Sequence, residues 1–251
     1  PLKFGIIAST DTHLGIPGAV DESSFQGHGG AGKSFRSSIP EGLQDDIEFN
    51  PGGLAVAWAE ENSRSAIFDA FKRKEVYGTS GPRFIVRFFV GDNLDQNLCN
   101  NPDNISYAYA NATPMGGTIA SDSLSQPSIF ISASADSFIK DQFLEKLQVV
   151  KGVVRNGELL TTVHDVGVTD AQSKLNISNC EVTGVGEKSM CSVWNDPNFN
   201  SSENAYYYVR VVANKSCRWS HDLCLKNPEY CETDSDVITP KFIQERAWTS
   251  P

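Results

Sequence analysis

Short strand-forming runs separated by turn-forming residues dominate the chain from residue 84 onward. They lie at residues 84–90, 128–132, 147–155, 159–164, 192–194 and 206–212. Asn156-Gly157 separates two of these runs, and an Asn-Gly pair between strands is a strong signal for a β-hairpin. Short strands punctuated by turns are typical of an antiparallel sandwich. We therefore expect residues 84–251 to form a β-rich, sandwich-like domain.

The first 83 residues carry a different pattern. Leu2–Ser9 is an apolar run that predicts a buried strand, and the Gly-, Ser- and Pro-rich residues 14–53 predict a long loop. Asn62 or Ser63 can cap a helix that continues to Lys74. This order indicates an α/β unit, and 251 residues provide enough chain for two domains. We place the boundary so that residues 1–83 precede the β-rich domain.

The charge balance bears on the partners of the chain. Lys and Arg total 21 against 31 Asp and Glu, which gives a net charge of −10. Because an acidic chain is repelled by phosphate backbones, we expect no nucleic-acid partner. No run of about 18 apolar residues exists, so we expect no membrane span. The chain opens at Pro1 without a signal peptide, and we interpret it as a mature or internal piece of a longer protein.

The six cysteines predict disulfides. The C-x2-4-C pairs typical of structural zinc sites are absent, so an oxidising compartment is the favoured interpretation. Six cysteines allow 15 pairings, and the spacing alone does not decide among them. The local expectation is Cys180 with Cys191 and Cys217 with Cys224.

Asn-x-Ser/Thr sequons support the same compartment. They stand at Asn104, Asn111, Asn176, Asn200 and Asn214. Such sequons are the acceptor sites of N-glycosylation in secreted eukaryotic proteins. Together with the cysteines, they favour a secreted, extracellular or periplasmic protein.

Asp11 and His13 are the first candidates for metal binding. They follow the predicted strand 2–9 with one residue between them. Residues i and i+2 of a strand project to the same side, so both side chains can reach one point in space. A carboxylate and an imidazole suit zinc, manganese or iron. Two ligands are too few for a complete hydrolytic site, because such metals usually take three or more protein ligands.

The sequence around this pair resembles a known metal-binding motif. Residues 4–13, Phe-Gly-Ile-Ile-Ala-Ser-Thr-Asp-Thr-His, resemble the last motif of the polymerase-and-histidinol-phosphatase (PHP) superfamily. Further stretches resemble one branch of it, the domain-of-unknown-function 3604 family. These stretches lie at residues 17–22, 27–32, 53–64, 77–83, 107–117, 148–152, 217–220 and 243–251.

This resemblance implies a fold and an activity. Residues 1–83 would be the C-terminal end of a distorted PHP-type (β/α) barrel, and Asp11 and His13 would bind divalent transition metal ions. The other ligands of the superfamily would lie in a missing N-terminal part of the same protein. The implied reaction is attack of metal-activated water on a small phosphoester-like substrate.

Two further residues are candidates for contact with that substrate. His28 lies in the Gly-rich loop after the metal motif and can act as a proton donor, or it can be an ordinary loop histidine. Arg83 follows Gly81-Pro82 and can clamp phosphate oxygens, or it can form a surface salt bridge. Asp21 and Glu22 can supply a metal ligand, although most loop carboxylates are simply solvated.

A rival interpretation rests on residues 27–34. Gly-His-Gly-Gly-Ala-Gly-Lys33-Ser34 matches the nucleotide-binding pattern G-x-x-x-x-G-K-[ST]. That site needs a buried strand before it and a helix after it. Residues 17–26 do not form an apolar strand, and Pro40 ends any helix within two turns. We therefore interpret the segment as a flexible loop.

Two functions remain open from the sequence. The first is the C-terminal portion of a secreted or periplasmic metal-dependent hydrolase, most simply a phosphoesterase. The second is a non-catalytic structural or binding module of an extracellular glycoprotein assembly that retains hydrolase ancestry. Bound metal and upstream ligands distinguish the two.

Overall fold

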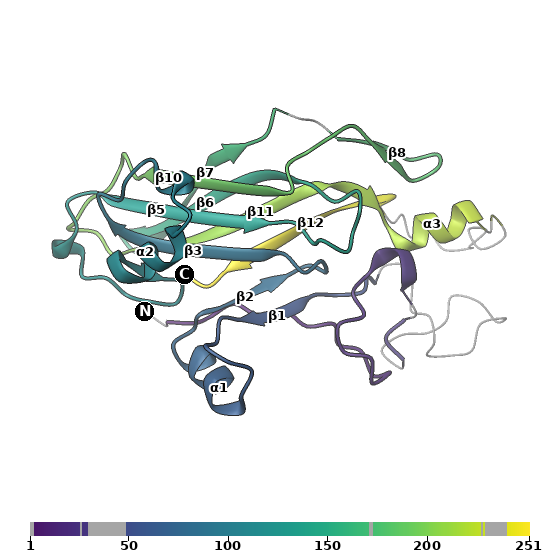
Figure 1. The fold of residues 1–251 in the computed structure, drawn as a ribbon, viewed down its shortest axis with the longest axis horizontal. Helices are drawn as coiled ribbons and strands as arrows, with labels where there is room; N and C mark the ends of the chain where they lie inside the picture. The colour runs from purple at the N-terminus through teal and green to yellow at the C-terminus, as the bar shows by residue number, and fades with distance from the viewer. Residues whose placement is uncertain (1–2, 26, 30–48, 171–172, 227, 229–239) are drawn as a thin grey trace.

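Two antiparallel sheets form the body of the molecule (Figure 1). The computed structural model describes residues 3–25, 27–29, 49–170, 173–226, 228 and 240–251. The larger sheet has the strand order β1-β2-β12-β11-β6-β7. Its strands are β1 Leu54–Ala57, β2 Val76–Thr79, β6 Leu144–Arg155, β7 Glu158–Val168, β11 Ala205–Cys217 and β12 Phe242–Thr249.

The smaller sheet has the order β10-β5-β3-β4. Its strands are β3 Ile85–Asp92, β4 Ala112–Pro114, β5 Pro127–Ser134 and β10 Ser189–Asn195. A separate two-stranded ribbon pairs β8 Lys174–Asn176 with β9 Glu181–Thr183. Every neighbouring pair in the two sheets is antiparallel.

Short helices lie around the sheets. The α-helices are α1 Arg64–Lys72, α2 Asn104–Asn111 and α3 Trp219–Lys226, and the 3-10 helices are η1 Glu22–Ser24, η2 Leu98–Asn100 and η3 Ser121–Ser123. Figure 1 shows α2 and α3 at opposite ends of the sandwich and α1 beside β1 and β2. Ser63 caps the N-terminus of α1, as predicted. Its side chain accepts a hydrogen bond from the backbone N–H of Ala66.

The core lies between the two sheets. Its fully buried side chains alternate along the strands, which is the two-residue period of a sheet with one face inward. They come from both sheets and include Val86, Phe88, Ile129, Ile131, Leu147, Val149, Val209, Val211 and Ala247. A smaller cluster of Phe89, Leu94, Leu98, Ala108 and Phe130 packs under η2 and α2. Burial of this apolar surface drives the two sheets together.

The predicted hairpin at Asn156-Gly157 is confirmed. Both residues have positive φ, 52° and 82°, as a type I′ turn requires. The turn joins β6 to β7, which pair along their whole length. The predicted strand 84–90 is also confirmed, as β3.

The expected end of a (β/α) barrel is wrong. Among the described residues of 1–83, the strands are β1 and β2, and they are antiparallel members of the larger sheet. β2 pairs with β12 from the other end of the chain. The described residues contain no closed barrel, and their architecture is a β-sandwich. The domain boundary at residue 83 stays a prediction, and strands from both sides of it share one sheet.

The predicted buried strand at residues 2–9 is also wrong over its described part. Residues 3–9 form no strand, and Phe4 and Ile7 are 60% and 54% exposed. Isolated hydrogen bonds hold the segment in place, rather than the regular hydrogen-bond ladder of a strand pair. The backbone N–H of Ile6 donates to Ser250 Oγ at 2.9 Å, and that of Gly53 donates to the carbonyl of Ser9 at 2.9 Å.

Candidate functional site

Asp11 and His13 lie side by side on the surface. His13 Nε2 is 3.8 Å from Asp11 Oδ1, and the two side chains are 58% and 85% exposed. We expected the pair to follow a strand, but no strand precedes it in the described residues. Asp11 instead has a φ of 56°, a left-handed conformation that aspartate tolerates better than most residues. A turn therefore brings the two side chains together.

The pair offers two ligand atoms for a metal ion. In the described part of the chain, no third His, Cys, Asp or Glu joins Asp11 and His13 at ligand distance. A carboxylate oxygen and an imidazole nitrogen suit a first-row transition metal ion. A closed coordination shell needs further ligands from outside these residues.

His28 is joined to this pair through the backbone. The N–H of His13 donates to the carbonyl of His28 at 2.6 Å. The His28 side chain is buried, and its ring lies 5.2 Å from that of Phe25 and 6.2 Å from that of Phe49. The structure thus places His28 in an aromatic environment, and its role as a proton donor stays a prediction.

Arg83 anchors the loop that follows Asp11 and His13. Its guanidinium Nη2 donates to the carbonyl of Gly18 at 3.0 Å, and its backbone N–H donates to Asp136 Oδ2 at 2.8 Å. The turn between β2 and β3 therefore holds the loop by a direct bond. The phosphate contact predicted for Arg83 stays a prediction.

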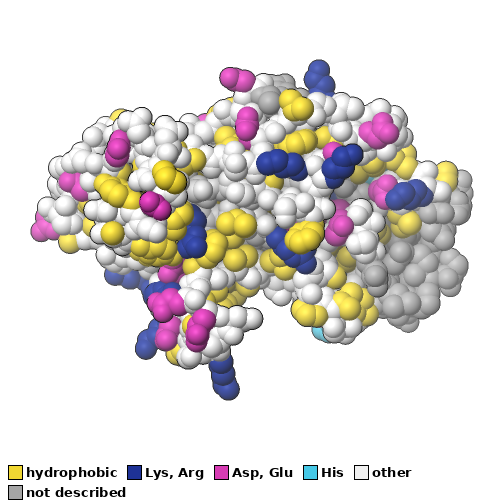
Figure 2. Space-filling view, in the orientation of Figure 1, with side chains coloured by type: hydrophobic (Ala, Val, Ile, Leu, Met, Phe, Trp, Pro, Cys, Tyr) yellow, Lys and Arg dark blue, Asp and Glu magenta, His cyan; other side chains and the backbone are white. Residues whose placement is uncertain are grey.

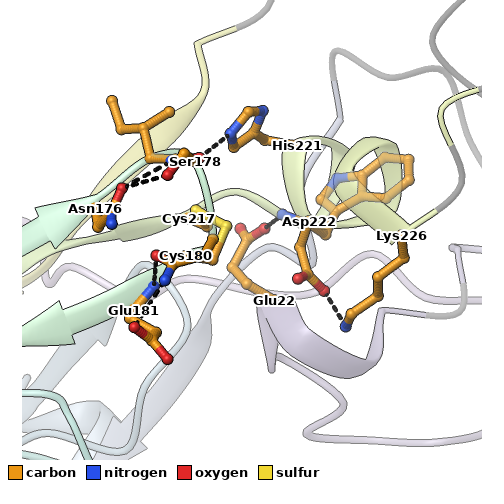
Figure 3. Close-up of a disulfide and its surroundings, with 12 residues drawn as sticks. Glu22, Asn176, Ser178, Cys180, Glu181, Cys217, His221, Asp222 and Lys226 are labelled. Carbon is orange, nitrogen blue, oxygen red and sulfur yellow. Dashed lines mark hydrogen bonds and ion pairs between the residues drawn. A yellow bond between two sulfur atoms is a disulfide. The ribbon is translucent and has the colours of Figure 1, made fainter.

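Glu22 connects the same loop to α3. Glu22 Oε2 accepts a hydrogen bond of 2.7 Å from the backbone N–H of Trp219, the first residue of α3 (Figure 3). The indole of Trp219 lies 5.0 Å from the ring of Phe25, and its Nε1 donates to the carbonyl of Phe49 at 2.7 Å. A carboxylate at a helix N-terminus is favourable, because it meets the positive end of the helix dipole.

Glu245 is a second acid beneath this loop. It lies on β12 with its side chain facing inward and is only 4% exposed. The hydroxyl of Ser80 donates to Glu245 Oε2, and Ser80 Oγ also accepts from the backbone N–H of Arg246 at 2.8 Å. Gly81 lies against both Glu245 and the carbonyl of Val20. The turn after β2 thus brings β12 and the loop together.

Both acids hold their protons more tightly than ordinary glutamates. Burial raises the pKa of Glu22 to about 7, against the lowering effects of the Trp219 N–H and Arg218. The pKa of Glu245 is likewise raised to about 7, chiefly by burial and in smaller part by the charge of Glu22, against the lowering effects of the Ser80 hydroxyl and Arg246. Each carboxyl group therefore gains or loses its proton near neutral pH. This property suits general acid–base catalysis or a response to pH.

The disulfides join segments distant in sequence. Cys99 pairs with Cys191 and Cys180 pairs with Cys217, so the expected local pairs Cys180–Cys191 and Cys217–Cys224 are wrong. Cys224 is also disulfide-bonded. Figure 3 shows the Cys180–Cys217 bridge beside Glu22 and His221. Although the two sulfurs and a ring nitrogen of His221 lie within 4.8 Å of one another, bridged sulfurs are not thiolate ligands.

The sequons occupy different environments. Asn176 and Asn200 are exposed, and the side-chain oxygen of each accepts from the backbone and hydroxyl of the serine two residues later. Asn104 and Asn111 are the first and last residues of α2. Asn214 is 3% exposed, and its Nδ2 donates to the carbonyl of Asp141 at 3.0 Å. Glycosylation at these positions stays a prediction.

Two surface features complete the description. Figure 2 shows acidic and basic side chains interspersed over one face of the molecule, with hydrophobic side chains exposed between them. On the outer side of α1, Phe68 is 65% exposed and helps to line an open hollow of about 870 Å³. The lining is largely apolar, so the hollow does not supply a catalytic constellation.

Comparison with known proteins identifies the family. The family model described as "Protein of unknown function (DUF3604)" matches residues 1–251. The chain belongs to the DUF3604 family. Searches of curated proteins and of solved structures found no match to this DUF3604 chain. No helix in the described ranges has both the length and the apolar character needed to cross a membrane.

Sequence reasoning missed part of this site. From the sequence, Glu22 was a possible metal ligand or an ordinary loop carboxylate, and Glu245 was not singled out. A signal for Glu245 was present, because it shares the inward face of β12 with Ala247 and Thr249 at a two-residue period. The nucleotide-binding pattern falls mostly outside the described residues, since Lys33 and Ser34 are not among them.

Proposed function

We propose that this chain is part of a secreted or periplasmic metal-dependent hydrolase of the PHP superfamily, to which it contributes Asp11 and His13 as metal ligands. The observation that carries the proposal is the 3.8 Å approach of His13 Nε2 to Asp11 Oδ1, with both side chains open to solvent. A cation between them meets one negative and one neutral donor, the combination that zinc, manganese and iron bind.

The remaining ligands come from elsewhere in the protein, in a preceding part of the same polypeptide. Asp11 and His13 would hold the metal through one carboxylate oxygen and one imidazole nitrogen, and the metal would supply a water molecule of lowered pKa for attack on a small phosphoester-like substrate. Arg83 fastens the loop that follows the pair through its bond to the carbonyl of Gly18.

The disulfides support a secreted location. The bridges Cys99–Cys191 and Cys180–Cys217 persist in an oxidising compartment and are rare in the cytosol. The exposed sequons at Asn176 and Asn200 fit passage through a eukaryotic secretory pathway.

Metal analysis and hydrolysis by the full-length protein test the proposal. Asp11→Ala and His13→Ala are each expected to reduce the metal content and to abolish hydrolysis of an aryl phosphate. Because its side chain is exposed, His13→Ala is expected to change the free energy of unfolding by less than about 0.5 kcal/mol, whereas Asp11→Ala is expected to cost about 1 kcal/mol, since alanine tolerates the left-handed backbone at this position less well. Asp122→Ala, at an exposed position of η3, is the control that keeps metal and activity.

The opposite result favours the second function. If metal content and turnover are the same in the wild-type protein and both variants, Asp11 and His13 are not ligands. Full-length protein that binds no metal at all would support the non-catalytic structural or binding module.

A further inference from the structure

Two cysteines and a histidine from three parts of the fold meet at one point (Figure 3). Cys180 lies in the turn between β8 and β9, Cys217 is the last residue of β11, and His221 lies in the first turn of α3. The two sulfurs and a ring nitrogen of His221 all lie within 4.8 Å of one another. The three side chains are half-buried, so a dissolved ion can reach them. These three residues are the Cys–His cluster.

The cluster has the donor set of a zinc site once its bridge is open. In the oxidised protein the two sulfurs are bonded to each other, and a bridged sulfur is not a thiolate. After reduction, the two cysteines supply two thiolates beside an imidazole. Zinc accepts this set of two cysteines and one histidine, with the fourth position left for water. Soft sulfur ligands also select zinc over magnesium or calcium.

The spacing of the cluster suits such an ion with little movement of the backbone. A tetrahedral zinc ion holds its sulfur and nitrogen ligand atoms roughly 3.5–3.8 Å apart. The Cα atoms of Cys180 and Cys217 are 5.5 Å apart, and the ring nitrogen of His221 lies within 4.8 Å of both sulfurs. Rotation of the cysteine side chains after reduction is therefore enough to separate the sulfurs to this spacing.

His221 is held beside the bridge by a bond that does not involve the cysteines. Its Nε2 lies 2.8 Å from the carbonyl of Ile177, and a carbonyl only accepts, so Nε2 donates (Figure 3). Ile177 and Cys180 belong to the same turn between β8 and β9. The bond thus keeps the imidazole against this turn, and its small net strength lets a metal–nitrogen bond replace it.

We propose that the Cys–His cluster is a redox-gated metal site, which binds one zinc ion when Cys180 and Cys217 are reduced and is closed by their bridge. A small thiol opens the bridge by exchange: two molecules of it become a disulfide, and each cysteine becomes a thiol. Zinc then displaces one proton from each thiol. Exchange with the oxidised form of the small thiol reverses these steps and releases the ion. The proposal does not rest on the proposed function, because Asp11 and His13 take no part in it.

The site acts on the chain before its bridges are complete. The protein has six cysteines, which allow 15 pairings. Thiolates attack disulfides, so a free Cys180 or Cys217 can exchange with the wrong partner. Zinc in the cluster occupies both thiolates and holds them next to each other. Their native pairing is then favoured when the ion is lost.

Cobalt(II) absorption of the full-length protein tests the site. Cobalt takes the place of zinc, and its bonds to sulfur give a near-ultraviolet charge-transfer absorption that oxygen and nitrogen ligands do not give. The protein is reduced with a small thiol, which is then removed, and alkylation with mass spectrometry establishes that Cys180 and Cys217 are open. We expect one cobalt ion per chain with this absorption, its displacement by zinc, and no such absorption before reduction.

Variants distinguish the cluster from the other cysteines and from Asp11 and His13. Since loss of even an outer partner of a metal site costs about 10–100-fold in affinity, His221→Ala and Cys180→Ser are each expected to weaken cobalt binding at least about tenfold. Glu181→Gln, at an exposed position next to Cys180, is the matched control and keeps the wild-type affinity. Asp11→Ala is expected to leave the sulfur absorption unchanged.

Two results overturn the proposal. The first is reduced wild-type protein that shows no sulfur–cobalt absorption, or shows it equally in His221→Ala. The second comes from Cys180→His, which leaves the Cys99–Cys191 bridge oxidised and offers the Cys217 thiolate with two imidazoles. This variant is expected to bind cobalt through sulfur without any reductant, so it decides the question even if full reduction unfolds the protein. Failure of Cys180→His to bind cobalt contradicts the site.

Discussion

Removal of the Cys99–Cys191 disulfide is expected to cost more stability than removal of any short-range contact in the molecule. The bridge joins η2 to β10 across a sequence separation of 92 residues. In the chain-entropy description, a closed loop of that length destabilises the unfolded state by about 4.6 kcal/mol at 25 °C. Since a domain is stable by roughly 5–15 kcal/mol, the Cys99→Ala/Cys191→Ala variant should be marginally folded.

The second bridge provides the internal control. Cys180 and Cys217 are separated by 37 residues, for which the same description gives about 3.8 kcal/mol. Urea unfolding of the two double variants measures both losses, and the slope of free energy against urea should increase in each because the unfolded chain becomes more expanded. A loss below about 1 kcal/mol for the Cys99–Cys191 pair, with an unchanged slope, would refute the reasoning.

Three further outcomes follow from buried polar groups. Because the pKa of Glu245 is about 7 when folded and 4.5 when free, its contribution to stability is full below pH 4.5 and falls by about 3 kcal/mol as the pH rises through 7. Urea unfolding at pH 5 and 8 measures this, and Glu245→Gln should remove that share of the difference and leave the share of Glu22, whose pKa is also raised to about 7. Lys151→Met leaves Asp196, 1% exposed, without its ion pair and should cost about 3–5 kcal/mol in the same assay, of which Lys151→Met/Asp196→Asn regains a part. Asn214 has no room for a sugar, so glycopeptide mass spectrometry of folded, secreted protein should find it unmodified, and a glycan there would contradict the buried geometry.

Local features of the fold were predictable because their causes are local. The cap at Ser63 needs only the N–H of Ala66, three residues away. The hairpin at Asn156-Gly157 needs two adjacent residues that tolerate positive φ. The strand β3 follows from its own run of aliphatic and aromatic residues.

Long-range pairing was not predictable, because it depends on residues far apart in the chain. β2 contains only four residues and finds its partner in β12, about 170 residues later. The apolar run at 3–9 has the composition of a strand, but it pairs with no described strand, and Phe4 and Ile7 remain exposed. The partner of Cys99 lies 92 residues away, a distance at which spacing carries no information.

The candidate site divides in the same way. Asp11 and His13 meet because one residue separates them, and the sequence was sufficient to place them together. Glu22 and Glu245 stand more than 200 residues apart, so their proximity could only come from the fold. Burial raises the pKa of both acids, and the residues next to each of them in the sequence do not show that it is buried.

The pairing of β2 with β12 constrains how the protein acquires its structure during synthesis. The middle of the larger sheet is complete only when residues 242–249 have left the ribosome, because β12 separates β2 from β11. Until then, β1 and β2 form an isolated hairpin, which is marginal in water. The nascent chain therefore carries exposed strand edges until β12 has been synthesised, which slows folding and exposes the chain to aggregation.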